Sequence, residues 1–384
     1  MSPQPVLDWA PIARLALFGV VLASGPLAWV WLRHHGAEPA TRLRALTWLT
    51  LFLTFDLVLF GAFTRLTDSG LGCPDWPGCY GSASPVGARD QIQAAQAALP
   101  TGPVTPSKAW VEMIHRYLAT GVGVLITVLA LASWALARQR RMTVSPWWAT
   151  LTLAWVCLQG LFGALTVTMK LYPAIVTLHL LGGLGLLALL AGLSQALVRA
   201  PLVLSAGLRA ACVALAVLSL VQITLGGWVS TNYAVLACTD FPRCQSSWWP
   251  VMDFAQGFSV LRELGAGRDG GYLPFAALTA IHYAHRLGAY LVLVAMGLLA
   301  WRLHASGLPM LRRWALRLGV IALWQLLSGL GNVVLGWPLW AALAHTGGAA
   351  ALVIVLTMML VRSRQTGAVN PPVQAPRGPV RAAS

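Results

Sequence analysis

Charged residues are scarce in this chain. Asp, Glu, Lys and Arg make up 10% of its 384 residues, whereas hydrophobic residues make up 58%, and the mean hydropathy is +0.70. A soluble domain carries roughly 25% charged residues. This composition therefore excludes an ordinary soluble protein and predicts that most of the chain lies in lipid.

The sequence also lacks the pattern by which basic proteins bind nucleic acid. Lys and Arg outnumber Asp and Glu by 26 to 11, giving a net charge of +15. A nucleic-acid surface would need these residues in a stripe with interleaved aromatics. They lie instead in short loops between apolar runs, which is typical of membrane topology. We expect membrane lipid, and no nucleic acid, as a partner.

Nine uninterrupted apolar runs are long enough to cross a bilayer as helices. They lie near residues 11–33, 45–66, 109–137, 146–168, 172–199, 206–230, 275–303, 310–335 and 338–362. The short loops on one side are rich in Arg, whereas the long loops 67–108 and 231–274 mix acids with bases. The positive-inside rule places the long loops and the N-terminus outside and the C-terminus in the cytoplasm.

The two ends of the chain carry predictions of their own. Residues 1–44 are expected to form a transmembrane helix and a cytoplasmic loop; a signal peptide is the alternative, but no basic n-region or clear cleavage site is visible. Residues 363–384 are rich in Pro, Gly and polar residues and are predicted to be a disordered cytoplasmic tail. The bacterial plasma membrane and the mitochondrial inner membrane would both suit such a protein. No Arg-rich, acid-poor transit segment for mitochondrial import is visible, so we expect the bacterial membrane.

The chain contains an internal repeat. Cys73 and Cys79 recur as Cys238 and Cys244, at an offset of 165 residues, and Gly61, Gln159 and Gly163 also have counterparts. The repeats cover residues 45–199 and 206–362, with four helices each. Because four is an even number, both repeats point the same way. The predicted fold is an all-α membrane protein of two parallel four-helix bundles, related by a pseudo-twofold axis along the membrane normal, plus the N-terminal helix.

Four histidines occupy equivalent places in the two repeats: His115 and His179, then His285 and His345. Each lies about two turns or less inside the outer end of its helix, and ionisable residues at such depth mark functional sites. Histidines facing each other across a bundle are suited to holding haem iron from both sides. The alternative is four core histidines paired with neighbouring carbonyls or hydroxyls. Zinc fits less well, because the outer cysteines lie too far away in depth.

Glu112 lies three residues before His115 on the same helix face, and the second repeat has His282 near that place. An acid in one repeat only suggests one catalytic haem site and one electron-carrying site; the alternative is a glutamate favoured by the helix dipole. His282 is either a rival to His285 as ligand or a partner of a propionate.

Three arginines are candidates to pair with haem propionates: Arg116, Arg286 and, at an outer helix end, Arg65. The alternative is that they snorkel to the membrane interface.

The two cysteine pairs, Cys73 with Cys79 and Cys238 with Cys244, lie in outer loops that both carry Asp, an aromatic residue and Pro between the cysteines. Disulfides are expected in an oxidising outer compartment. They are either structural or involved in redox chemistry or in contact with a haem donor.

Taken together, these motifs resemble haem A synthase, of the class with cysteine pairs in its outer loops. The resemblance rests on the segment GAFTRLTDSGLGCPDWPGC at 61–79, on Glu-Met-Ile-His-Arg at 112–116, and on the repeated histidines and cysteine loops. It covers about residues 45–362. The family core has eight spans, so the helix at 11–33 is a departure whose role the resemblance does not give.

The resemblance implies that a ring methyl of haem O is oxidised to a formyl group, by successive hydroxylations with oxygen and electrons, to give haem A. His115 and His179 would hold the substrate or product haem, with Glu112 beside the reacting edge, and His285 and His345 would hold haem b. The implied partners are haem O synthase as donor, an electron donor, and the assembly of a terminal oxidase downstream; a homo-oligomer stays open.

Two other functions fit the same residues. The first is a di-haem b-type cytochrome that only passes electrons, against which the single Glu112 and the cysteine loops argue. The second is a haem transporter, which the parallel repeats would suit. A transporter should have a matched pair of Gly/Pro-broken helices near the midplane, and none is visible.

Overall fold

A computed structural model describes residues 10–198, 200–268 and 270–365. Within these ranges the chain is helical and has no strand, only isolated β-bridges. Among the described residues, nine helices are long and apolar enough to span a membrane, which confirms the prediction of a multi-pass helical protein. The predicted tail lies outside the described residues from 366 onward.

The spanning helices closely follow the predicted runs. They are α1 (Ala10–Arg33), α2 (Pro39–Leu66), α4 (Pro106–Arg138), α5 (Trp147–Thr168), α6 (Pro173–Ala196), α7 (Ala206–Thr231), α9 (Phe275–Ala305), α10 (Pro309–Val334) and α11 (Leu339–Arg364). The largest difference is that α2 begins at Pro39 rather than near 45. A proline at the first helical turn has its φ already set for a helix, so the loop between α1 and α2 is shorter than predicted.

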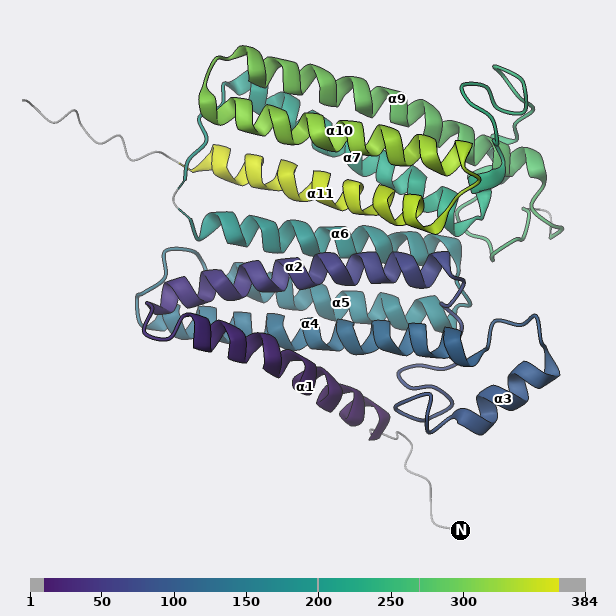
Figure 1. Cartoon of the computed structure of the whole chain (residues 1–384), viewed down its shortest axis with the longest axis horizontal. Helices are drawn as coiled ribbons and strands as arrows, with labels where there is room; N and C mark the ends of the chain where they lie inside the picture. Colours follow the sequence, from purple (N-terminus) through teal and green to yellow (C-terminus); the bar gives the residue numbers. More distant parts are fainter. Residues whose placement is uncertain (1–9, 199, 269, 366–384) are drawn as a thin grey trace, which may run out of the picture.

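The long loops contain short helices that the hydrophobic pattern did not reveal. They are α3 (Arg89–Ala98) in the first loop, and the 3₁₀ turn η1 (Ala234–Leu236) and α8 (Phe254–Gly257) in the second. Figure 1 places both loops at the same end of the helices.

The helices of each half pack in a closed circuit. In the first half, α2 and α5 each contact both α4 and α6. In the second half, α7 and α10 each contact both α9 and α11. Over the described residues, α4 makes no close backbone contact with α6, nor α9 with α11. The histidine-bearing helices of each half therefore lie diagonally opposite one another.

The two halves meet along α2, α6, α7 and α11 (Figure 1). At the end with the long loops, Arg65 Nη2 donates to the carbonyl of Ser230 (2.7 Å), and the Tyr233 hydroxyl donates to Asp68 (2.7 Å). At the opposite end, Arg362 Nε donates to Gln195 Oε1 (2.5 Å). The two largest buried apolar clusters lie mostly in one half each, and α11 contributes to both, with Ala350 in the first and Leu352 in the second.

Helix α1 packs against α4 and, less extensively, α2 on the outer face of the first half (Figure 1). The approach is close at Gly19, where an added Cβ would lie 2.5 Å from Thr120 Cγ2. The Ala10 end of α1 lies on the side of the long loops, as the predicted alternation of spans requires.

Candidate active site

Each of the four repeat histidines lies against a glycine of the neighbouring helix. An added Cβ at Gly61 would lie 3.0 Å from the imidazole of His115, and one at Gly226 would lie 2.9 Å from that of His285. The corresponding distances are 3.6 Å for Gly163 and His179 and 3.1 Å for Gly329 and His345. Three of these glycines, Gly61, Gly226 and Gly329, thus leave space for an imidazole that a Cβ would crowd, whereas the contact at Gly163 is an ordinary one.

In the second half the two rings lie near each other. The centroids of His285 and His345 are 6.4 Å apart, with ring planes at 86°. A metal–imidazole bond is about 2.0 Å and the bonded nitrogen lies about 1 Å from the ring centre, so two rings on one metal have centroids roughly 6 Å apart. The second half therefore fits an iron held between two histidines.

The remaining ring nitrogens differ between the halves. His285 Nδ1 lies 2.9 Å from Gln222 Nε2, and His345 Nδ1 lies 3.0 Å from the Ser328 hydroxyl. The Nδ1 atoms of His115 and His179 are buried without a hydrogen-bond partner. The ring of His115 is covered instead by Phe60, at 6.3 Å between centroids.

Glu112 is buried, with 4% of its surface exposed. Its Oε2 accepts the backbone N–H of Cys73 (2.8 Å), and its Oε1 pairs with Arg116 one turn further along α4. The other terminal nitrogen of Arg116 donates to the carbonyls of Asp75 (2.9 Å) and Gly78 (2.5 Å), among others. The acid and the arginine thus hold the first cysteine loop onto α4, directly beside His115.

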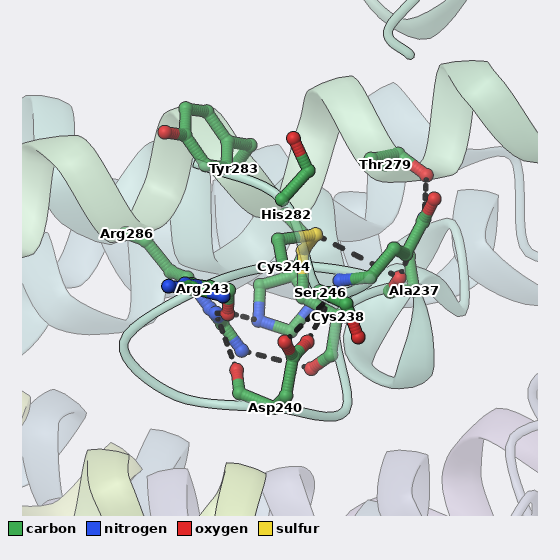
Figure 2. The surroundings of a disulfide bond; sticks show 12 residues. Ala237, Cys238, Asp240, Arg243, Cys244, Ser246, Thr279, His282, Tyr283 and Arg286 are labelled. Carbon is green, nitrogen blue, oxygen red and sulfur yellow. Dashed lines mark hydrogen bonds between the residues drawn. A yellow bond between two sulfur atoms is a disulfide. The ribbon is translucent and has the colours of Figure 1, made fainter. Parts of the chain in front are cut away.

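The second cysteine loop is held in the same way (Figure 2). Arg286 donates to the carbonyls of Cys238, Asp240 and Arg243, each at 2.8 Å. Its Nε lies 3.4 Å from Nε2 of His282, which occupies the place of Glu112. The contacts of Arg116 and Arg286 are therefore to loop carbonyls, a role that neither sequence-based alternative included.

An aspartate in each loop fixes the turn after the second cysteine. Asp240 accepts the backbone N–H groups of Gln245 (2.7 Å) and Ser246 (2.9 Å), and Asp75 does the same for the two residues after Cys79. Desolvation opposes ionisation, but these N–H groups hold the pKa of Asp240 below its ordinary value. The sequence shows that both loops carry an Asp between the cysteines. It does not show which backbone N–H groups these aspartates accept.

Both predicted disulfides, Cys73–Cys79 and Cys238–Cys244, are present. Arg65, the third candidate for a propionate, donates to Asp68 and Ser230 and lies 4.1 Å from the ring centre of Tyr233. It joins the two halves at the long-loop end.

Replacing Arg286 with leucine should make the Cys238–Cys244 disulfide easier to reduce. Three carbonyls of the loop lose their shared cation, and one hydrogen bond to a charged group contributes about 1.5–3 kcal/mol. We expect reduction by dithiothreitol, followed by alkylation and mass spectrometry, to be at least about tenfold faster than in the wild type. Arg243→Ala, which alters an exposed side chain of the same loop, is the control; equal rates in all three proteins would contradict the anchoring role.

The fold and the site define a polytopic helical membrane protein with two pairs of half-buried histidines beneath disulfide-closed loops. A model of the family described as cytochrome oxidase assembly protein matches residues 44–357. The haem A synthase of Shewanella oneidensis is 40% identical over 318 residues, covering 81% of this chain and 94% of that protein. The haem A synthase of Methylobacterium radiotolerans is 29% identical over 355 residues, covering 86% and 93%. The chain belongs to the haem A synthase family.

Proposed function

We propose that this protein is a haem A synthase that oxidises the ring methyl of haem O to a formyl group by successive hydroxylations. The observation that carries the proposal is the set of four half-buried histidines, each in contact with a glycine of the next helix. Relatives named haem A synthase match this chain over nearly their whole length.

The architecture proposed for this activity is two parallel four-helix bundles, 45–199 and 206–362, related by a pseudo-twofold axis along the membrane normal. It is supported by the matching circuits of helix contacts in the two halves. The proposed setting is a bacterial plasma membrane, with the long loops and N-terminus outside and the C-terminus in the cytoplasm. The long loops and the start of α1 lying at one end of the helices agree with this orientation (Figure 1).

The second bundle is proposed to hold haem b between His285 and His345. Their 6.4 Å ring separation and the partners of their Nδ1 atoms support this ligand pair over His282, whose Nε2 faces Arg286. Haem b bound there would supply electrons one at a time to the reaction in the other half.

The first bundle is proposed to bind haem O and release haem A, through His115 and His179. Glu112 is the proposed catalytic acid, one helix turn from His115. Its Oε1 and Oε2 are held by Arg116 and the Cys73 N–H, so the carboxyl group is fixed in position. Protonation of Oε2 would change its contact with the loop, and protonation of Oε1 would change its contact with Arg116. Roles of Arg116 and Arg286 at propionates stay predictions, because both side chains hold loop carbonyls here.

The proposed partners follow from this reaction. Haem O synthase would deliver the substrate, a separate electron donor would reduce the haem b, and terminal oxidase assembly would consume the product. The disulfide loops are held against the histidine-bearing helices α4 and α9, and their contact with a haem donor stays a prediction.

The test is to purify the protein in detergent from cells that make haem O, extract its haems and separate them by chromatography. Haem B together with haem O, haem A or a hydroxylated intermediate supports the proposal. Two haem B per chain would favour an electron-transfer cytochrome, and no haem would favour a transporter.

Gly226→Ala should remove haem b from the second bundle. The new methyl group would lie 2.9 Å from Cε1 of His285, too close for the ring to keep its place. Alanine is favoured over glycine in a helix by about 1 kcal/mol, so the helix itself is not weakened. Gly297→Ala on α9, where nothing lies within 4 Å of the new Cβ, is the matched control. The measurement is the pyridine haemochrome per chain. Equal haem b content in both variants would contradict the proposed haem b site at His285.

A further inference from the structure

The histidines of the two halves differ in the hydrogen-bond partners of their Nδ1 atoms. In the second half, Ser328 on α10 contacts Nδ1 of His345 (3.0 Å) and Gln222 on α7 contacts Nδ1 of His285 (2.9 Å). In the first half, Nδ1 of His115 and Nδ1 of His179 are buried and have no hydrogen-bond partner.

The repeat explains this difference. At the offset of 165 that relates Gly61 to Gly226, the residue matching Gln222 is Leu57. At the offset of 166 that relates Gly163 to Gly329, the residue matching Ser328 is Phe162. Two polar side chains in one half are thus replaced by two apolar ones in the other, while the histidines and their glycines are kept.

The Ser328 contact fixes the form of imidazole that binds a metal. The Ser328 hydroxyl donates to the carbonyl of Trp324 (2.7 Å), which leaves a lone pair to accept Nδ1–H of His345. With the proton held on Nδ1, the lone pair of Nε2 is available as a ligand. An acceptor behind a metal-bound histidine orients the ring and makes it a stronger donor.

Gln222 restrains His285 at two points. Its Nε2 lies 2.9 Å from both Nδ1 and the backbone carbonyl of His285, and its Oε1 is buried without a partner. The carboxamide carries both a donor and an acceptor. Rotation about its last bond can therefore bring the partnerless oxygen to Nδ1–H when Nε2 of His285 binds iron, and the hydrogen bond to the backbone carbonyl is then given up.

We propose that Ser328 and Gln222 are positioning residues that make the second half retain its haem, and that the unsupported His115 and His179 make the first half release its haem. This inference rests on the proposed function, and it accounts for how one fold keeps a haem in one half and exchanges a haem in the other. A substrate must leave as product, so weaker ligands suit the first half, whereas an electron carrier must stay.

The test uses the detergent-purified full chain and two variants, Ser328→Ala and Gln222→Leu, the second of which introduces the residue found at position 57. Haem b transfer to excess apomyoglobin should become about tenfold or more faster in each, the size of effect typical when a ligand loses its outer partner. The midpoint potential of the haem b should rise in Ser328→Ala, because a weaker donor favours the ferrous iron.

Ser219→Ala is the matched control, since it removes a buried hydroxyl without a partner from α7, one turn from Gln222. The reciprocal variant Leu57→Gln should slow haem loss from the first half, a gain that misfolding would not produce. Unchanged rates and potential in Ser328→Ala and Gln222→Leu, or an equal increase in Ser219→Ala, would overturn the inference. A wild-type protein with no haem would overturn the proposed function as well, whereas a haem-retaining wild type with insensitive variants overturns this inference alone.

Discussion

Replacing His285 with alanine is expected to abolish the haem b spectrum of the purified protein. The His285 ring faces His345 and fills the space that Gly226 leaves, whereas Nε2 of His282 faces Arg286 instead. The measurement is the reduced-minus-oxidised absorbance spectrum together with haem content per chain.

His282→Ala is the matched control for this result. His282 lies one turn nearer the helix start and its Nε2 faces Arg286, which keeps three carbonyl partners without it. The variant should therefore retain haem b. The opposite pattern would be loss of the spectrum in His282→Ala and its retention in His285→Ala. That result would make His282 the ligand and contradict the proposed ligand pair of His285 and His345.

The second large effect is expected at Glu112, where two substitutions separate chemistry from structure. Glu112→Gln keeps an acceptor for the Cys73 N–H and nearly the same volume, but removes the charge. If the carboxyl group acts as a general acid or base, haem A formation should fall by about 10²-fold or more while both haems stay bound. The readout is chromatography of the haems extracted from cells that make haem O.

Glu112→Ala should behave differently, because it leaves both the Cys73 N–H and the buried Arg116 without any acceptor from this side chain. Removing one partner of a buried ion pair costs about 3–5 kcal/mol, so this variant should lose thermal stability as well as activity. If Glu112→Gln makes haem A at the wild-type rate and only Glu112→Ala fails, the acid anchors the loop and has no catalytic role.

The features that the sequence predicted correctly are those that short stretches of chain encode. Each span is a run of apolar residues long enough to cross the bilayer, and the cysteine pairs are only six residues apart, so both could be read locally. The family was evident because motifs such as Glu112 to Arg116 keep their spacing along the chain.

The partners of the polar side chains were not predictable in this way. Arg116 and Arg286 were expected at haem propionates or at the membrane interface, yet their donors meet carbonyls about 40 residues earlier in the chain. Nothing in the local pattern of α4 or α9 indicates that a loop folds back onto them.

The sequence by itself therefore determined the number of spans, the repeat, the disulfides and the family, because length, hydropathy and spacing act along the chain. Only the tertiary structure decided which groups contact Nδ1 of each histidine and which groups pair with the carboxylate of Glu112. Those hydrogen bonds join helices far apart in sequence, and a buried polar atom takes whichever partner the packing of those helices brings within reach.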